Sequence, residues 1–539
     1  MLQRKLLLLL VIAALASSSF ASEKVINQEE NLPMKWWQNT IVYQVYPKTF
    51  RDASGNKGLR AITNTLDYLK DLGVGAIWIT PFYPSPMVDN GYDISDYTGI
   101  DEQYGSMKDF EELISEANKR GIKIVMDLVF NHSSDQHKWF LESKQSRDNP
   151  KTDWYIWRDK PTNWRSIFGG SVWTWNEDRQ QYYLHTFAKE QPDLNWENPE
   201  VRQALYDAAN YWLDKGVGGF RIDAITYIKK PAEFLYGTPD GQDGLINVHT
   251  MTANTPGILD FLHEFKRKVF DGHDIFTVGE ANGVKAEELP QWVGRNGVFD
   301  MLFEFSHTTL AYSESEFWCY PREWKLTELK GALRNSQEAT KINGWYPVYF
   351  ENHDRPRSIN YYMPEGADKI KAAQALATIL LTMRGTPFIY QGEEVGMCNA
   401  DWKNIDEIND IQSHGQYDFA LSEGFTPEQA LKFVSFFTRD NARTPIKWNN
   451  SDAVLSWYKT LAKFRRENPE LITGDYNEIL RDSEEIFAYT RGNITVAVNF
   501  SVKEIDLPEE LFAGKNIALS SEATPKPLAL APLEARIYK

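Results

Sequence analysis

The five residues Gly219-Phe220-Arg221-Ile222-Asp223 form a short run that ends in an arginine and an aspartate two positions apart. Side chains two apart on a strand point to the same face, so both charged groups would leave the strand together. Similar runs recur along the chain and alternate with amphipathic helical stretches. They span residues 41–46, 76–80, 122–130, 219–223, 275–280, 298–305, 347–352 and 387–390. Eight strands joined by crossover helices predict a (β/α)8 TIM barrel of the α/β class.

Two segments break this rhythm and predict attached domains. Residues 132–195 are rich in Trp, Asp, Asn and Gly and lack a long helical period, which indicates an inserted domain B after the third strand. After a helical stretch at 458–467, short alternating runs such as 486–490 and 494–500 are typical of antiparallel strands. We expect a catalytic barrel at 33–131 and 196–457, domain B at 132–195, and a linking helix with a C-terminal antiparallel β domain at 458–539.

Residues 1–21 have the pattern of a signal peptide. Arg4 and Lys5 precede an apolar run at 6–16, and small residues lead up to a cleavage position after Ala21. The run is shorter than the ~20 residues that a membrane span needs. We expect a periplasmic or secreted protein with no membrane span after cleavage, and an uncleaved anchor is the alternative.

The composition of the 539 residues narrows the class of partner. Acidic residues number 75 against 58 Lys and Arg, and the net charge of -17 would repel a phosphate backbone, so nucleic acid is excluded as a partner. Cys319 and Cys398 allow at most one disulfide, and we expect two unpaired thiols. The oligomeric state stays open.

Carboxyl groups end two of the predicted strands. The guanidinium of Arg221 favours the ionised form of Asp223, as a nucleophile requires. Glu280 follows apolar and small residues, where low-dielectric surroundings favour the protonated form that a general acid requires. On adjacent strand ends two such groups can lie ~5 Å apart, as in retaining glycosidases. The alternatives are a structural Arg–Asp salt bridge and a Glu280 that only caps the next helix.

Polar clusters close two further strands, at residues 127–132 and at Asn352-His353-Asp354. A histidine beside an aspartate ligates a metal only where several more ligands converge. With nine histidines in the chain, we interpret His132 and His353 as neutral hydrogen-bond partners of polyhydroxyl groups.

Taken together, residues 127–132, residues 219–223, Glu280 and His353-Asp354 resemble the four ordered signature regions of the α-amylase family, glycoside hydrolase family 13. The resemblance covers about residues 36–539. Residues 191–195, Gln-Pro-Asp-Leu-Asn, resemble the marker of its oligo-1,6-glucosidase and α-glucosidase subgroup. Further matches lie at residues 36–37, 42–47, 89–94, 390–394 and 439–445. The subgroup acts on small saccharides rather than on starch.

The resemblance implies that Asp223 is the nucleophile, Glu280 the acid/base and Asp354 a third carboxylate that stabilises the distorted sugar. It also implies a substrate-binding set around them. His132, His353 and Arg221 would bond to hydroxyls and to the nucleophile, Asp89 with Arg439 would close the pocket, Tyr92 would stack on the sugar, and Phe168 would line the wall. We expect some further rings of this region to wall the pocket and others to belong to the core; these rings are Trp154, Trp157, Trp164, Trp173 and Trp175.

Three positions depart from the family. Many relatives carry an acidic metal loop after the first strand, but here the segment 52–60 is short, with Lys57 and Gly58 where acidic ligands are needed. We therefore predict no calcium, no other metal and no cofactor. Ala224, after the nucleophile, favours α-1,4 over α-1,6 linkages and leaves mixed specificity open. Arg355 replaces a commoner Gln and adds positive charge.

The leading hypothesis is an exported retaining exo-α-glucosidase that hydrolyses short α-1,4- or α-1,6-linked gluco-oligosaccharides and disaccharides through a covalent glycosyl-enzyme. A glucosyl-transferring isomerase of the trehalose synthase or sucrose isomerase type shares these residues and differs in whether water or a sugar hydroxyl resolves that intermediate. A third hypothesis is a non-enzymatic ancillary subunit of an amino-acid transporter, in which the site is eroded. The three carboxylates present here argue against it.

Overall fold

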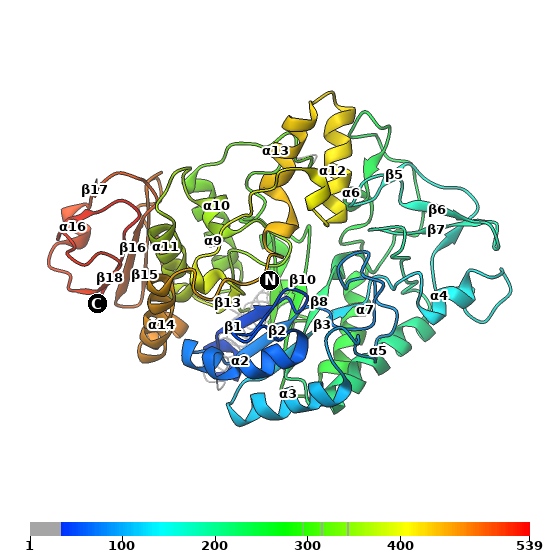
Figure 1. The fold of residues 1–539 in the computed structure, drawn as a ribbon, viewed down its shortest axis with the longest axis horizontal. Helices are drawn as coiled ribbons and strands as arrows, with labels where there is room; N and C mark the ends of the chain where they lie inside the picture. Colours follow the sequence, from blue (N-terminus) through cyan, green and yellow to red (C-terminus); the bar gives the residue numbers. More distant parts are fainter. Residues whose placement is uncertain (1–33, 295, 314–315, 342–343) are drawn as a thin grey trace, which may run out of the picture.

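The largest sheet holds eight parallel strands in the order β11-β10-β8-β3-β2-β1-β13-β12 (Figure 1). The structure is a computed structural model that describes residues 34–294, 296–313, 316–341 and 344–539. The end strands β11 and β12 lie in contact, so the sheet is a nearly closed barrel and the predicted fold is confirmed. Its strands are β1 (Val42–Val45), β2 (Ala76–Ile79), β3 (Lys123–Val129), β8 (Gly219–Asp223), β10 (Phe276–Glu280), β11 (Met301–Phe303), β12 (Pro347–Val348) and β13 (Thr386–Tyr390).

Helices cover the outside of the barrel. α2 shows why they pack there, because Leu59, Ile62, Leu66 and Leu69 recur at helical spacing on one face and are all fully buried. The helices between strands are α2 (Gly58–Leu72), α3 (Met107–Lys119), α5 (Pro199–Asp214), α7 (Ile258–Phe265), α8 (Leu289–Trp292), α9 (Leu326–Ala339), α10 (Ser358–Tyr362) and α11 (Lys369–Thr382). A separate buried cluster fills the barrel interior with side chains that include Val42, Trp78, Val125, Val278, Met301, Phe303 and Phe388.

Two barrel strands are shorter than the sequence predicts. Before β11, the N–H groups of Val298 and Phe299 both donate to the carbonyl of Trp292, so they belong to a turn. After β12, the side chains of Glu351 and Asn352 accept backbone N–H groups of the following loop. These local hydrogen bonds hold both segments in turns or loops, so each strand covers only part of its apolar run.

The segment after β3 forms a small unit with its own sheet. β6 (Trp173–Asn176) and β7 (Gln181–Leu184) form an antiparallel hairpin, and β4 (Trp157–Arg158) extends it; a short helix, α4 (Lys138–Ser143), precedes them. β5 (Trp164–Arg165) pairs with β9 (Ile246–Asn247), which precedes α6 (Val248–Thr252) in the loop after β8. The loop after β8 therefore belongs to the same side of the molecule as the insertion.

The C-terminal part is an antiparallel sheet, as predicted. Its order is β14-β15-β16-β20-β18, and β17 pairs with β19 beside it. α14 (Asp452–Glu467) leads into it through α15 (Glu470–Thr473) and begins earlier than the predicted helix, because the Ser451 hydroxyl caps it. The remaining elements are β14 (Tyr476–Ile479), β15 (Ile486–Arg491), β16 (Ile494–Asn499), β17 (Ile505–Asp506), α16 (Glu509–Phe512), β18 (Ile517–Ser520), β19 (Ala529–Leu530) and β20 (Ala535–Tyr538).

Two helices between β13 and α14 were not expected from the sequence. α12 (Ile411–Ser422) and α13 (Pro427–Phe437) rise above the barrel in Figure 1, and Gly415 of α12 approaches the backbone of Phe168. They therefore add a wall to the end of the barrel at which the insertion lies.

The predictions for the two cysteines and for the signal peptide have different outcomes. Cys319 and Cys398 are both unpaired, as expected. The predicted signal peptide, residues 1–21, lies outside the described residues. Across residues 34–539, apart from the five undescribed positions within them, no helix combines the length and the apolar character of a membrane span.

Candidate active site

Two of the three predicted catalytic carboxyl groups come from neighbouring strands, and the third comes from the loop after β12. Asp223 is the last residue of β8, Glu280 is the last residue of β10, and Asp354 follows β12. β8 and β10 are paired in parallel with Ile222 beside Gly279, which brings the next residues, Asp223 and Glu280, side by side. At the start of β8, a Cβ atom on Gly219 would lie 2.1 Å from the carbonyl oxygen of Phe276, so only glycine allows this approach.

Arg221 holds the carboxyl groups together. Its Nη1 donates to Asp127 Oδ1 and to Asp223 Oδ1, each at 2.7 Å, and its Nη2 donates to Glu280. The residue is 1% exposed, so these charge-assisted bonds lie away from bulk water. The prediction that Arg221 and Asp223 point the same way is therefore confirmed, and one guanidinium serves three carboxyl groups.

Burial and charge act in opposite directions on these acids. Burial raises the pKa of Asp223, the Arg221 guanidinium opposes this shift, and Glu280 adds to it through its charge and a hydrogen bond. Two carboxyl groups so close disfavour double ionisation. Burial and the neighbouring Glu280 therefore hold the pKa of Asp223 above its usual range despite the Arg221 guanidinium.

Asp354 has the opposite tendency. Burial acts to raise its pKa, but His353, Arg439 and Arg443 together hold the pKa of Asp354 well below its usual range. His353 Nε2 lies 2.9 Å from Asp354 Oδ2, and Arg443 Nη2 lies 2.7 Å from Asp354 Oδ1. Asp354 is therefore a fixed negative charge beside the Asp223–Glu280 pair.

Asp89 and Arg439 close one end of the site. Arg439 Nη2 donates to Asp89 Oδ1 at 2.9 Å, and the same guanidinium reaches Asp354 at 3.5 Å and Asp410 at 2.6 Å. The guanidinium also lies 4.8 Å above the ring of Phe168. Both residues of the Asp89–Arg439 pair are buried, so this end of the pocket is a wall.

Tyr92, His353 and His132 form a hydrogen-bonded layer under the carboxylates. The hydroxyl of Tyr92 lies 2.6 Å from His353 Nε2 and donates to Asp127 Oδ2 at 3.0 Å, and the two rings stack. Burial lowers the pKa of His132, which lies 3.1 Å from the side-chain nitrogen of Gln191. His132 is therefore neutral, as the sequence predicts for a hydroxyl partner.

One pocket collects most of the predicted site. Asp223, Glu280, Asp354, Asp89, Tyr92, His132, Phe168 and Arg439 line it. Arg221 and His353 do not line it, and they contact its lining from beneath. The expectation for the tryptophans was wrong, since none of the five lines this pocket. Trp164 and Trp173, for example, are buried in the separate apolar core of the insertion.

Several lining residues were missed by the sequence reasoning. They are Ile167, Phe187, Tyr227, Asn282, Thr309, Tyr312, Glu316 and Gln412. Gln412 comes from α12, which was not expected, whereas Asn282 follows Glu280 by two positions and strand-end position could have indicated it. Asp410, which anchors Arg439, has no signal in a single sequence because its partner lies 29 positions away.

Ala224, directly after the nucleophile, has a left-handed backbone with φ of 46°. Its N–H donates to Glu280 Oε2 at 3.1 Å. Strain at a non-glycine residue is found where the surrounding structure fixes it, often at active sites. Here the conformation aims a backbone donor at the acid/base candidate.

Two loops near the barrel ends hold polar clusters whose charged groups bond to other groups of the protein. Lys230 Nζ donates to Asn131 Oδ1 at 3.1 Å and lies 2.7 Å from Asp193 Oδ2. In the loop after β1, the carboxylate of Asp52 accepts four hydrogen bonds, from the N–H groups of Ser54 and Asn56 and from the side-chain amides of Asn56 and Asn64. The acceptor capacity of Asp52 is thus used by the protein itself.

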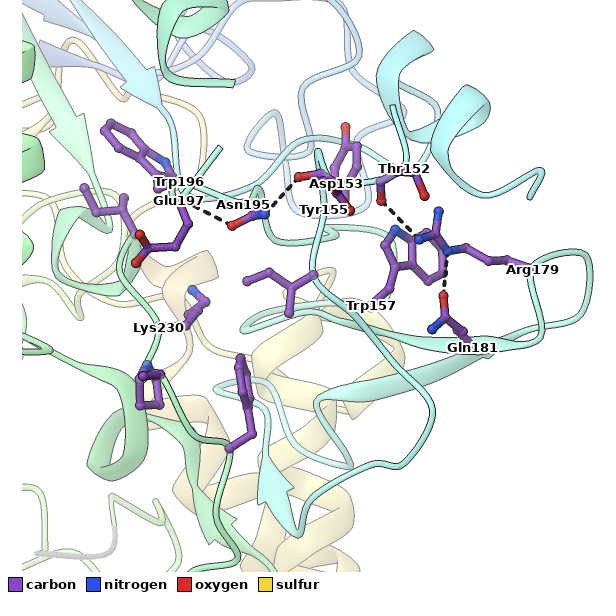
Figure 2. A pocket seen from close by; sticks show the side chains of 15 residues that line it. Thr152, Asp153, Tyr155, Trp157, Arg179, Gln181, Asn195, Trp196, Glu197 and Lys230 are labelled. Carbon is purple, nitrogen blue, oxygen red and sulfur yellow. Dashed lines mark hydrogen bonds between the residues drawn. The ribbon is translucent and has the colours of Figure 1, made fainter. Parts of the chain in front are cut away.

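A larger cavity of about 610 Å³ lies beside the insertion (Figure 2). Four aromatic side chains line it, namely Tyr155, Trp157, Trp196 and Phe234, and other protein groups pack against Trp157 and Phe234. Phe140 stacks parallel to Trp157 and the Arg179 guanidinium lies 4.5 Å over the same ring, while Trp164 stacks on Phe234. The paired carboxyl groups of the reaction lie elsewhere, so the chemistry belongs to the pocket of Asp223.

Comparison with known proteins agrees with this geometry. Residues 44–496 match the alpha amylase catalytic domain. An oligo-1,6-glucosidase of Parageobacillus thermoglucosidasius is 39% identical over 555 residues, which cover 94% of this chain and 99% of the relative. A trehalose-6-phosphate hydrolase of Escherichia coli (strain K12) is 38% identical over 494 residues, 85% of this chain and 88% of the relative.

Among solved structures, a mutant isomaltulose synthase from Erwinia rhapontici NX5 in complex with D-glucose superposes with a TM-score of 0.88 at 36% identity, covering 94% of this chain and 99% of that one. The family match, the long relatives and the barrel with its strand-end carboxylates agree. The chain belongs to the α-amylase family and is a glycoside hydrolase.

Proposed function

We propose that the protein is an exported, retaining exo-α-glucosidase that releases glucose from short α-linked gluco-oligosaccharides and disaccharides. The observation that carries this proposal is the shared guanidinium of Arg221, which bonds to both Asp223 and Glu280. Two carboxyl groups on one guanidinium lie close together, as in retaining enzymes, whereas inverting enzymes separate them by ~6.5–9.5 Å to admit a water.

The reaction proceeds in two displacements. Asp223 attacks the anomeric carbon while Glu280 protonates the glycosidic oxygen, and the leaving group departs as an alcohol. Glu280, now ionised, removes a proton from a water that attacks the glycosyl–Asp223 ester, and both carboxyl groups return to their starting state. Asp354 and the Ala224 N–H contribute charge and positioning beside the oxocarbenium-like sugar.

The buried Asp89–Arg439 pair supports exo action. A longer chain cannot extend past it, so the terminal sugar must enter alone. The donors and acceptors of this pair are suited to the hydroxyls of a terminal glucosyl unit.

The linkage preference follows from two opposing indications. The small side chain of Ala224 favours α-1,4 substrates, whereas the relative from Parageobacillus thermoglucosidasius is named for α-1,6 activity. We propose activity on both linkages, with maltose and isomaltose as the first substrates to compare.

The second candidate is a glucosyl-transferring isomerase. The similarity to an isomaltulose synthase over 94% of the chain favours it. Such an enzyme forms the same glycosyl–Asp223 ester but resolves it with a hydroxyl of the departed sugar instead of water.

Product analysis separates the two candidates. The protein is incubated with maltose, isomaltose, sucrose and trehalose, and all saccharides are resolved over time. A hydrolase releases two glucose molecules from each maltose, isomaltose or trehalose, and one glucose with one fructose from each sucrose. In sucrose the only glucose comes from the glucosyl–enzyme, so a retaining hydrolase forms its α anomer first in NMR spectra. Formation of isomeric disaccharides without free glucose would show that the protein is an isomerase and not a hydrolase. Release of the glucosyl unit of sucrose as β-glucose would exclude a retaining mechanism.

Export and the lack of a metal requirement belong to the same proposal. Residues 1–21 carry the signal pattern, so the mature chain recovered from the producing cells should begin at Ser22 and lie outside the cytoplasm. Because Asp52 already accepts four hydrogen bonds, calcium and EDTA should leave the melting temperature and kcat/KM unchanged. A rise in melting temperature with calcium would contradict the second part.

A further inference from the structure

Arg355 lines the same pocket as the catalytic carboxyl groups but differs from the other arginines near it. It follows Asp354 directly, and its guanidinium lies 4.8 Å over the ring of Phe305. Nη1 donates to the hydroxyl of Tyr312 at 3.2 Å, while Nε is buried without a hydrogen-bond partner among the described residues, as are the Nε atoms of Arg221 and Arg357. Aromatic rings and one phenol are thus its main neighbours.

The arginines around it all have carboxylate partners. Arg221 contacts Asp223, Arg357 contacts Glu351, and Arg439 and Arg443 both contact Asp354. Among the described residues, no carboxylate forms an ion pair with Arg355 within 4.0 Å, so its positive charge has no direct carboxylate partner. A charge in such surroundings is costly unless a partner neutralises it, so a ligand that brings negative charge gains from it.

The position of Arg355 indicates that it would contact the leaving group, the part of the substrate that departs when the glycosidic bond breaks. Asp89 and Arg439 close the far end of the pocket, so the departing group must leave along the other wall. The pocket adjoins a second cavity of about 570 Å³, which reaches α12 and shares five lining residues with it, namely Ile167, Phe168, Tyr312, Glu316 and Gln412. A leaving group in this passage would lie next to the Tyr312–Arg355 pair.

We propose that Arg355 is a specificity-determining residue that selects α-glucosides whose leaving group carries a negative charge, such as a carboxylate or a phosphate. This inference rests on the proposed function and adds the class of leaving group to it. The guanidinium offers donors that remain free after its bond to Tyr312, in a planar arrangement that matches a carboxylate or phosphate.

Glu316 supplies a control of opposite sign on the same wall. It lines both cavities, and its Oε2 accepts only a long hydrogen bond, 3.4 Å, from the side chain of Asn247 among the bonds described. Its charge would repel an acidic leaving group. Glu316→Gln should therefore shift selectivity toward acidic leaving groups, whereas Arg355→Gln should shift it away.

The test compares phenyl α-glucoside with its meta- and para-carboxyphenyl analogues, which differ in one charged group. In Arg355→Gln, kcat/KM for the better carboxyphenyl substrate should fall about 10-fold or more relative to phenyl α-glucoside, as expected for loss of a hydrogen bond between charged groups. Arg355→Lys should recover part of the loss because it keeps the charge, and thermal unfolding of each variant monitors folding.

The outcomes separate this inference from the proposed function. If the wild-type protein hydrolyses phenyl α-glucoside but Arg355→Gln lowers kcat/KM equally for all three substrates, the inference is wrong and the proposed function stands. The same holds if Glu316→Gln and Arg355→Gln shift selectivity in the same direction. If the wild-type protein cleaves none of the three, both the proposed function and the inference fail.

Discussion

At the scale of single residues, the central feature is Arg221, because its guanidinium bonds to two carboxyl groups that must act differently. Residues 219–223 predicted this contact, since the arginine and the aspartate lie on one face of a strand. The third contact, to Glu280, depends on the register between β8 and β10 and is visible only in the fold.

Replacement of Asp223 by Asn should remove activity and leave the fold intact. The amide has the same shape but cannot form the glycosyl ester, so kcat should fall by about 10⁴-fold or more. Initial rates on maltose and thermal unfolding measure the two effects. Asp207→Asn, on the exposed side of α5, is the matched control and should keep wild-type kinetics. Near-normal turnover by Asp223→Asn would refute the assignment.

The closed end of the pocket depends on the fork of the Arg439 guanidinium, which reaches Asp89, Asp354 and Asp410 together. A lysine ammonium is a point charge and cannot make the same set of contacts. Arg439→Lys should lower kcat/KM for isomaltose by about 10²-fold, mainly through KM.

The matched control is Arg120→Lys at a surface ion pair with Asp67, which should leave kcat/KM unchanged. Equal kinetics for Arg439→Lys and the wild-type protein would show that the pair does not hold the sugar. Asp89 and Arg439 were predicted only through resemblance, because nothing in their 350-residue separation indicates contact.

At the scale of elements, Lys230 joins the loop after β8 to the segment after β3. Its ammonium contacts Asn131 and Asp193, and its side chain is nearly fully buried. Lys230→Met would leave the buried carboxylate of Asp193 without its cation, at a cost of about 3–5 kcal/mol. Denaturant unfolding should report this loss.

The neighbouring residue provides the control. Lys229 pairs with Glu197, whose side chain is 63% exposed, so Lys229→Met should cost less than about 1 kcal/mol. Equal stabilities for the two methionine variants would mean that Lys230 does not join these elements. The sequence did not indicate this role, because a lysine seven residues beyond the end of β8 has no distinguishing pattern.

A second element-scale feature is the buried Glu351 after β12. Burial raises the pKa of Glu351 to about 7, opposed by Arg357, from its ordinary value of 4.5. A carboxyl group whose pKa rises on folding stabilises the protein fully below pH 4.5, and this contribution is lost as the pH rises to about 7. Glu351→Gln should therefore gain stability relative to the wild-type protein as the pH rises across that window.

Melting temperatures measured at a series of pH values test this expectation, with Glu467→Gln on the exposed side of α14 as the control. The control should follow the wild-type curve. A constant difference between Glu351→Gln and the wild-type protein at all pH values would contradict the account of Glu351.

At the scale of the whole molecule, the sequence predicted the barrel because each of its eight strands is a short apolar run between amphipathic helices. It did not predict α12 and α13. These helices follow the last barrel strand, so they do not connect two strands as the other helices do. It also assigned too many tryptophans to the pocket, because aromatic content does not distinguish the core of a small unit such as that around Trp164 from a binding surface. Most of the site features that the sequence did not predict depend on contacts between residues far apart in the sequence.

The central claim is that Asp223 forms a covalent bond to a glucosyl unit. The most direct measurement incubates the protein with 5-fluoro-α-glucosyl fluoride, whose glycosyl ester hydrolyses slowly, and locates the label by peptide mass spectrometry. The account predicts one fluoroglucosyl group per chain, on the peptide that contains Asp223, with no label in Asp223→Asn. A label on another residue, or active enzyme that hydrolyses α-glucosides with inversion and never takes up the label, would contradict it.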